Sequence, residues 1–200
     1  MSDFLINREY SIYTKYPTNF TLHTCKDMTS KKKEYKPTKT DEIPKDIPNF
    51  GFVHVSVGKY PIKITTPVML CPFGFNRKIS QLALQFTNVQ NDPEMNGFFT
   101  FIQELEMEQM KYLGLSEEES DLYLSQIRFD KNNKYDPNLL IKVPFVKNKY
   151  EVDIRNKDEE SSIAQIYNFS KLKCDIYIDN IWKYNGKFVC KWKVDKVLIM

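Results

Sequence analysis

The sequence predicts a mainly β protein of the α+β class, an antiparallel barrel into which one long helix is inserted. Three observations predict this fold. Short runs of β-branched and aromatic residues lie before and after one segment with helical spacing, turn residues separate the runs, and strands do not alternate with helices. With 200 residues, 42% of them hydrophobic, the chain has the size and composition of one globular domain.

The first strands of this barrel begin at residue 50. Residues 50–57 and 60–66 are rich in β-branched and aromatic side chains, and Gly-Lys at 58–59 separates them. This pattern predicts a β-hairpin. Residues 79–86 form the next predicted strand, because their apolar side chains alternate, although imperfectly.

The inserted helix follows this strand. Asp92 is a typical N-cap residue, Pro93 suits the first helical position, and Gly114 ends the pattern. Apolar side chains between them recur at helical spacing, while charged residues fill the other positions. Ser116 and Glu119 then form a capping box, which predicts a short second helix.

The chain returns to strands after the helical region. Three of them are predicted at residues 123–129, 139–146 and 150–154. The C-terminal part gives the clearest β pattern, because residues 172–178 and 188–194 alternate apolar and polar side chains around the turn pair Asn185-Gly186. A long antiparallel hairpin is therefore predicted, and the OB-fold is the small barrel that fits this set of strands best.

The N-terminal part differs in composition from the barrel. Residues 29–49 hold three prolines and few apolar side chains, and lysines at 31–33 make them basic. We therefore predict an N-terminal extension over residues 1–49 that contains a flexible Pro/Lys-rich arm, followed by an OB-like domain over residues 50–200.

Composition excludes several kinds of chemistry. The two histidines, His23 and His54, cannot form a histidine-rich metal centre, and the four cysteines contain no C-x-x-C pair. No phosphate-binding glycine loop is present. We therefore expect no enzymatic activity, no metal and no cofactor. The sequence has neither a signal-peptide pattern nor a long apolar run, so we expect a soluble, cytosolic-type protein with reduced cysteines and no membrane contact.

Charge is distributed unevenly along the chain. Residues 104–121 hold seven acidic side chains and one basic one, so this segment has a charge of −6. The rest of the chain has a charge of +9, which gives the net charge of +3. A basic remainder with a separate acidic element fits a nucleic-acid-binding face and an element turned away from it. A solvated helix surface explains the acidic segment equally well.

The polar face of the predicted C-terminal hairpin combines lysines with aromatic rings. Lysines spaced along strands can follow phosphates, and a ring offers a stacking plane worth roughly 1–3 kcal/mol per base. Because duplex bases are already stacked, this combination favours unpaired strands. The candidate residues are Lys173, Tyr177, Trp182, Tyr184, Lys187, Lys191 and Lys193. Packing explains Trp182 and Tyr184 equally well, the lysines could merely keep an edge soluble, and we expect Trp192 in the core.

A second candidate region is the loop after residue 66. Pro67 and Pro72 stiffen the chain, and Gly74 lets the rings on either side of it splay apart. Such a loop is either a platform for bases or a plug for the barrel. Its candidate binding residues are Phe73, Phe75, Arg77 and Lys78.

Two blocks of the sequence resemble a known family. They are residues 64–74, ITTPVMLCPFG, and residues 181–194, IWKYNGKFVCKWKV. Together with the helix between them, they resemble the single-stranded-DNA-binding proteins encoded by nucleocytoplasmic large DNA viruses, which are regarded as OB-fold relatives of podophage replication single-strand binders. The order of elements matches over residues 50–200, but only these two blocks match as motifs.

The resemblance implies a function and a setting. It implies sequence-independent binding of unpaired DNA in viral replication or repair, with single-stranded DNA or RNA and replication proteins as partners. The expected location is the host cytoplasm, a viral replication factory or the virion. Podophage-type relatives end in an acidic tail that contacts replication enzymes, whereas this chain ends Lys196-Val197-Leu198-Ile199-Met200. That difference leaves the acidic segment at 104–121 as the candidate for such contacts.

Two other classes of function stay open at this point. A virion structural or assembly protein with a β-barrel fold and no nucleic-acid role would carry the basic surface incidentally. A metal-dependent nuclease would use Glu151 and Asp153, which lie on one face of a predicted strand.

Overall fold

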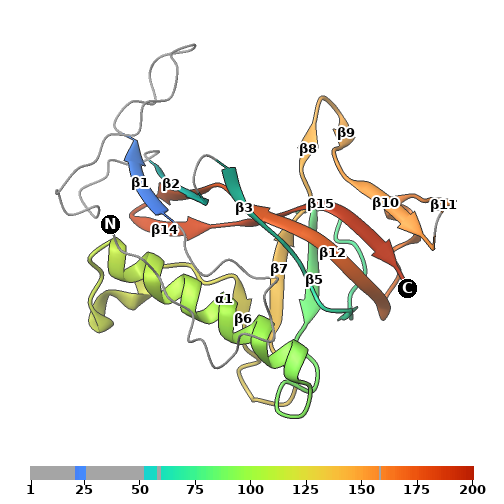
Figure 1. The fold of residues 1–200 in the computed structure, drawn as a ribbon, viewed down its shortest axis with the longest axis horizontal. Coiled ribbons are helices and arrows are strands. Elements are labelled where there is room, and N and C mark those ends of the chain that lie inside the picture. Colours follow the sequence, from blue (N-terminus) through green and yellow to red (C-terminus); the bar gives the residue numbers. More distant parts are fainter. Residues whose placement is uncertain (1–20, 26–51, 58–59, 158) are drawn as a thin grey trace.

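The computed structural model describes residues 21–25, 52–57, 60–157 and 159–200. Its strands are β1 (Thr21–Cys25), β2 (Phe52–Val57), β3 (Tyr60–Thr65), β4 (Met69–Cys71), β5 (Gln81–Gln85), β6 (Ile127–Arg128), β7 (Asn138–Lys142), β8 (Phe145–Val146), β9 (Lys149–Tyr150), β10 (Asp153–Asn156), β11 (Glu159–Glu160), β12 (Ser170–Ile178), β13 (Asn180–Tyr184), β14 (Lys187–Cys190) and β15 (Trp192–Ile199). The long helix is α1 (Pro93–Tyr112), and η3 (Glu117–Leu122) and η4 (Ile163–Gln165) are 3₁₀-helices. Figure 1 shows α1 lying along one side of the twisted sheet.

Five strands close into a barrel. β4 pairs with β5, β5 with β7, β7 with β15, β15 with β12, and β12 again with β4. Each pairing is antiparallel except that of β7 with β15, which is parallel. Numbered in chain order, the five barrel strands follow the circular order 1-2-3-5-4 of an OB-fold, with α1 inserted between the second and the third. The predicted fold class is confirmed.

The sheet continues beyond the barrel on the side of β12. There β3 pairs with β12, β2 with β3, and β13 with β2, and β14 forms the edge beside β13. β1, which falls within the predicted N-terminal extension, pairs antiparallel with β2. The basic arm at 29–49, with its lysines at 31–33, and the turn at 58–59 lie outside the described residues.

The predicted C-terminal hairpin is present, but it is interrupted. β13 and β14 form its outer part, joined at Asn185 and Gly186, which both have positive φ as a tight hairpin turn requires. β12 and β15 form its inner part, and their register shifts between Asp175 and Ile176. The inner part therefore belongs to the barrel, while the outer part extends beyond it with β2 and β3.

The helix prediction is also confirmed. The Asp92 carboxylate accepts hydrogen bonds from the backbone N–H groups of Glu94 at 2.9 Å and Met95 at 3.2 Å. Gly114 follows the helix with a φ of +65°, which glycine adopts freely and other residues rarely adopt. The buried face of α1 packs on the barrel through rings such as Phe98, which lies 5.6 Å from Phe86. Each fully buried side chain of this size contributes roughly 1.5–3 kcal/mol.

Several predicted strands are shorter than expected. The strand expected at 139–146 divides at Pro144, because proline has no N–H to donate, so β7 and β8 are separate. Only β6 forms in the segment 123–129, and Ile79 is exposed because β5 starts two residues later. β4 was expected to be loop, since prolines flank it. Trp192 is 2% exposed and lies in the core, as predicted.

Candidate functional site

Strand register brings a row of mostly polar side chains together on the outside of the barrel. Arg128 on β6 pairs with Asn138 on β7, Asn138 with Gln85 on β5, Gln85 with Leu70 on β4, and Leu70 with Lys171 on β12. Because directly paired residues point to the same side of a sheet, these five side chains form one outward row. β5 and β7 are the second and third strands of the barrel, the face through which OB-folds bind oligonucleotides.

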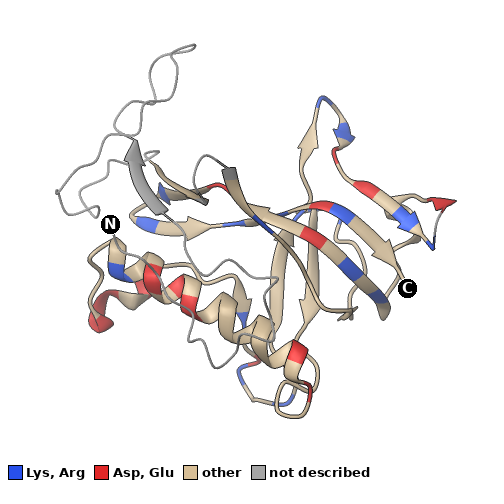
Figure 2. Ribbon diagram, viewed as in Figure 1, with Lys and Arg blue, Asp and Glu red and all other residues tan. Residues whose placement is uncertain are grey.

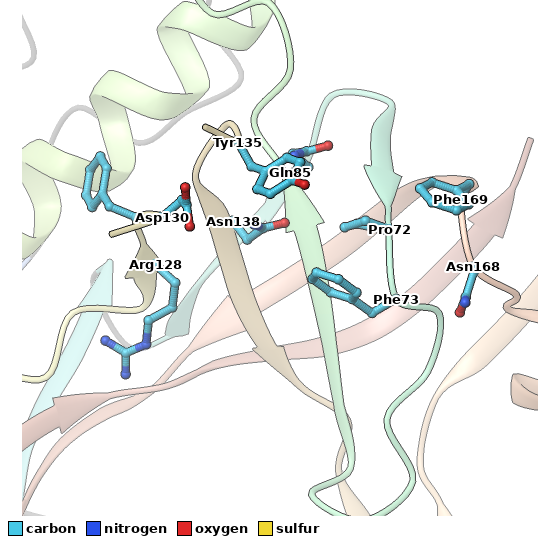
Figure 3. Close-up of a pocket in the computed structure, with 10 residues that line it drawn as sticks. Pro72, Phe73, Gln85, Arg128, Asp130, Tyr135, Asn138, Asn168 and Phe169 are labelled. Atoms are coloured by element: carbon cyan, nitrogen blue, oxygen red, sulfur yellow. The ribbon is translucent and has the colours of Figure 1, made fainter. Parts of the chain in front are cut away.

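A groove of about 560 Å³ lies over this row (Figure 3). We call it the aromatic groove. Its lining residues are Pro72, Phe73, Gln85, Arg128, Phe129, Asp130, Tyr135, Asn138, Asn168 and Phe169. Figure 3 shows Gln85 and Asn138 between Phe73 and Asp130. Four of the lining rings are largely exposed, Phe73 and Phe169 at 69% and Phe129 and Tyr135 at 61%.

One wall of the aromatic groove is built from two chain segments that hold each other. The N–H of Phe169 donates to the carbonyl of Cys71 at 2.8 Å, and the N–H of Phe75 donates to that of Ile166 at 3.3 Å. Gly74 has φ +61°, and a Cβ there would lie 2.9 Å from the Ile166 oxygen. Glycine is therefore required for the close approach that carries the Phe73 and Phe169 rings.

Phe169 itself has an unusual backbone conformation. Its φ is +64°, a region that bulky residues rarely adopt and that costs about 1–3 kcal/mol. The ring gains little from burial in return, because it is largely exposed. Strain of this kind concentrates at functional sites, and here it fixes an exposed ring at the edge of the groove.

The opposite wall is supported by the helix. Phe129 lies 6.5 Å from Phe99 of α1 in an edge-on arrangement, and Phe99 lies 4.9 Å from the buried Phe86. A continuous series of ring contacts thus connects the core to the groove. On the same side, the ammonium group of Lys134 lies 5.3 Å from the centre of the Tyr135 ring, so a cation accompanies this ring as well.

A buried carboxylate holds the segment that carries Arg128 and Phe129. Glu106 of α1 accepts hydrogen bonds from the hydroxyl of Ser125 at 2.6 Å and from the backbone N–H of Gln126 at 2.7 Å. Burial raises the pKa of the Glu106 carboxyl, and these two hydrogen bonds and the nearby Arg128 partly offset that rise. The acidic segment is thus more than a solvated surface, although Glu106 is only one of the acidic residues that Figure 2 shows along α1 and in the segment after it.

The predicted face of the C-terminal hairpin has a different character. Tyr177 lies in register between Lys193 on β15 and Lys63 on β3. Lys193 is 2.8 Å from a carboxylate oxygen of Asp179, and Lys63 forms an ion pair with Asp195. The hydrogen bond to Asp195 raises the pKa of Lys63. The lysines beside Tyr177 therefore have acidic partners within the protein.

The outer part of the hairpin holds the remaining predicted rings. Trp182 is half-buried, and its ring lies 5.0 Å from that of Phe52 on β2. Tyr184 is exposed and faces the exposed Lys187 in register. Lys173 on β12 and Lys191, between β14 and β15, are exposed as well.

The predicted loop residues divide into two groups. Phe73 lines the aromatic groove, and Arg77 and Lys78 are exposed in the turn before β5. Phe75 is only partly exposed, because its ring packs edge-on against Tyr150 at 5.0 Å. The structure thus brings one predicted ring, Phe73, into the groove, and the hairpin candidates lie on other strands.

Sequence reasoning missed most of the groove. It did not single out Arg128, Phe129, Tyr135 or Phe169. Tyr135 lies in a stretch of polar turn residues, in which an aromatic side chain has no apolar neighbours along the sequence to pack against. An aromatic residue within a polar turn was the available signal.

The structure also bears on the nuclease alternative. Asp153 forms an ion pair with Arg155 at 3.1 Å, and Glu151 is exposed. Among the residues described, no group of three or more His, Cys, Asp or Glu side chains is arranged to hold a metal ion. In the same part of the chain, no helix has the length and apolar character needed to cross a membrane.

Comparison with known proteins gives structural likenesses only. No protein-family model matches the chain, and no curated protein matches its sequence. The crystal structure of gp2.5, a single-stranded DNA-binding protein encoded by bacteriophage T7, is similar with a TM-score of 0.46 and 14% identity, over 69% of this chain and 91% of that one.

A second phage protein gives the same kind of match. The single-stranded DNA-binding protein from bacteriophage Enc34 matches with a TM-score of 0.46 and 11% identity, over 73% of this chain and 83% of that one. Its complex with single-stranded DNA matches with a TM-score of 0.43 and 12% identity, over 74% and 89%. Likenesses this distant do not assign a function, and membership of the large-DNA-virus family stays a prediction.

Proposed function

We propose that this protein binds single-stranded DNA without sequence preference, through aromatic stacking of bases and lysine or arginine contacts to phosphates. The aromatic groove carries the proposal. Four largely exposed rings surround a groove on the outer face of the second and third barrel strands, and Arg128 and Lys134 lie beside them. The proposed role in viral DNA replication or repair rests on the two resembling sequence blocks.

The groove favours unpaired bases over a duplex. A base can stack on a ring only when its own face is free, and every base has such a face. Phe73 and Phe169 come from two separate loops, and Phe129 and Tyr135 from the loop between β6 and β7, so the four rings would meet different parts of a strand. Stacking therefore selects for unpaired nucleic acid without selecting a sequence.

The exposed candidates of the hairpin extend the proposed surface. Tyr184 with Lys187 would offer one more stacking ring beside a cation, and Lys173 and Lys191 would attract phosphates. Trp182, Tyr177 and Lys193 already have ring or charge partners within the protein. We therefore assign the larger share of the binding energy to the groove.

The test is fluorescence anisotropy with a labelled oligonucleotide, single-stranded or annealed to its complement. The wild-type protein should bind the single strand more tightly. Phe73→Ala and Phe129→Ala should each weaken binding by about 1–3 kcal/mol, or roughly 5- to 150-fold. Phe145→Ala, which removes an exposed ring on β8 outside the groove, is the matched control and should change affinity little.

Two outcomes would contradict this function. Equal affinity for duplex and single strand would exclude stacking as the basis of binding. No binding to either would favour the alternative of a virion structural or assembly protein, whose oligomeric state the groove substitutions should leave unchanged.

A further inference from the structure

We propose that Lys142 and Lys191 form a phosphate-binding site for the backbone of a single strand whose bases occupy the aromatic groove. This inference rests on the proposed function and adds to it the path of the strand. The single-stranded DNA would run along the outer face of β7, from the aromatic groove at one end of β7 to the two lysines at its other end.

A second row of outward side chains locates the site. Gln81 on β5 pairs with Lys142 on β7, Lys142 with Lys193 on β15, Lys193 with Tyr177 on β12, and Tyr177 with Lys63 on β3. Lys191 precedes Lys193 by two residues, and both lie outside while Trp192 between them is buried. The row therefore concentrates lysines on neighbouring strands.

The lysines of this row differ in what compensates their charge. Lys193 and Lys63 have carboxylate partners, Asp179 and Asp195. Across the described ranges of the chain, by contrast, no carboxylate lies within ion-pair distance of Lys142 or Lys191. These two ammonium groups are therefore available to an external anion.

Lys142 and Lys191 are also close enough to repel each other. Partial burial lowers the pKa of Lys142, and the charge of Lys191 lowers it further. A phosphate between two such groups would remove the repulsion and gain attraction from both. The Lys142 ammonium is already fixed, because it donates a hydrogen bond to the carbonyl of Ile79 at 2.7 Å, so little side-chain freedom is lost on binding.

The surface between the two sites suits an extended strand. Asn138 in the groove and Lys142 lie on the same face of β7, four residues or about 13 Å apart. Between them lie Leu140 and its partner Ala83, both uncharged. The exposed Lys78 precedes Ile79, the residue whose carbonyl accepts the hydrogen bond from Lys142, so it lies in the turn next to the proposed phosphate site. Stacking at one end and phosphate contacts at the other would together fix the strand's direction along β7.

The test compares two double variants with the same loss of charge. Lys142→Gln with Lys191→Gln removes the proposed site, and Lys63→Gln with Lys193→Gln removes the two compensated lysines. Anisotropy titrations with an oligonucleotide of about sixteen nucleotides, the upper end of an OB-fold footprint, give the slope of log affinity against log salt. The first variant should lose about 0.7 of slope for each phosphate contact removed, and the second should keep the wild-type slope.

Two further measurements separate this inference from the proposed function. Lys142→Arg with Lys191→Arg should restore the slope, because arginine keeps the charge. With an oligonucleotide of about four nucleotides, the lower end of the footprint, the glutamine variant should bind as the wild type does, since the groove alone holds it.

The outcomes remain distinguishable. Equal changes of slope in the two glutamine variants would overturn the phosphate site, while a wild-type preference for single strands would leave the groove standing. A wild-type protein that binds no single strand would overturn both. All four lysines are at the surface, so we expect each variant to fold. A thermal unfolding measurement on each variant checks this.

Discussion

The aromatic groove and the part of the C-terminal hairpin around Tyr177, Trp182 and Lys193 contain the same kinds of residues, but the hairpin residues have partners within the protein, whereas the groove rings are largely exposed. On the hairpin, Lys193 is paired with Asp179, and Trp182 packs against Phe52. In the groove, Phe73 and Phe169 hold their rings in solvent, and Phe169 does so with a strained backbone. The first set of interactions is complete within the folded chain, whereas the second set leaves ring faces unused.

The difference shows that residue type does not by itself identify a binding surface. A lysine with a carboxylate partner must lose that partner before it can hold a phosphate, and a packed ring must be uncovered before a base can stack on it. An exposed ring on a fixed backbone requires neither step. Pre-organised, unused groups are therefore the better indication of a ligand.

The largest expected effect comes from breaking the groove wall with Gly74→Ala. The added Cβ would lie 2.9 Å from the Ile166 oxygen at a φ of +61°, so the two wall segments must separate. We expect unfolding free energy to fall by more than the roughly 1 kcal/mol of a positive-φ alanine, and single-strand affinity to fall at least tenfold. Denaturant unfolding and anisotropy measure the two effects.

Gly186→Ala is the matched control for this variant. Gly186 also has positive φ, at +75°, but no atom lies within 4 Å of a Cβ there. Cys71 offers a further readout, since burial raises the pKa of its thiol to about 11 and it should react slowly with thiol reagents until the wall opens. Equal behaviour of the two alanine variants would show that the close contact at Gly74 is unimportant.

A smaller effect is expected from Glu106, which supports the other wall. Glu106→Ala would leave the buried Gln126 N–H without its acceptor and would remove the shorter hydrogen bond of the Ser125 hydroxyl, at a cost of about 1–3 kcal/mol in unfolding free energy. Affinity should fall too, because Arg128 and Phe129 follow this segment. Glu106→Gln keeps an acceptor for Gln126 and should retain both stability and binding better than the alanine variant does.

The Glu106 carboxyl also predicts a pH dependence. Its pKa is raised in the folded state, so the folded protein holds this proton more tightly than the unfolded chain does. The resulting stabilisation is fully present below the ordinary glutamate pKa and is lost as pH rises through the raised value. Stability curves of wild type and Glu106→Gln measured across the acid range should therefore converge toward low pH, and parallel curves would contradict the shift.

The smallest effect is expected on the hairpin face. Tyr177→Ala removes a half-buried ring that lies between two lysines with acidic partners. Single-strand affinity should change less than about twofold, well below the roughly 1–3 kcal/mol expected for a stacking ring. A loss as large as that of Phe73→Ala would remove the distinction between the two surfaces.

Local patterns in the sequence were sufficient for most elements of the fold. The Asp92 cap, the Asn185-Gly186 turn and the alternation that buries Trp192 each depend on neighbours along the chain, and each is present. Such signals are short-range, so they survive without knowledge of the tertiary structure. The parallel pairing of β7 with β15 is different, because it joins strands about fifty residues apart.

The location of the candidate site depends on contacts between segments that are distant in the sequence. The sequence by itself determined which rings and lysines exist and, through alternation, which of them point outward. Only the tertiary structure decided which outward groups meet a partner, because strand pairing brings Lys193 to Asp179. It also decided which rings line the groove, because backbone hydrogen bonds join the segments that carry Phe73 and Phe169, which are far apart in the chain. Whether a side chain is satisfied is a property of its three-dimensional neighbours, and for that reason composition could indicate nucleic-acid binding without locating the groove.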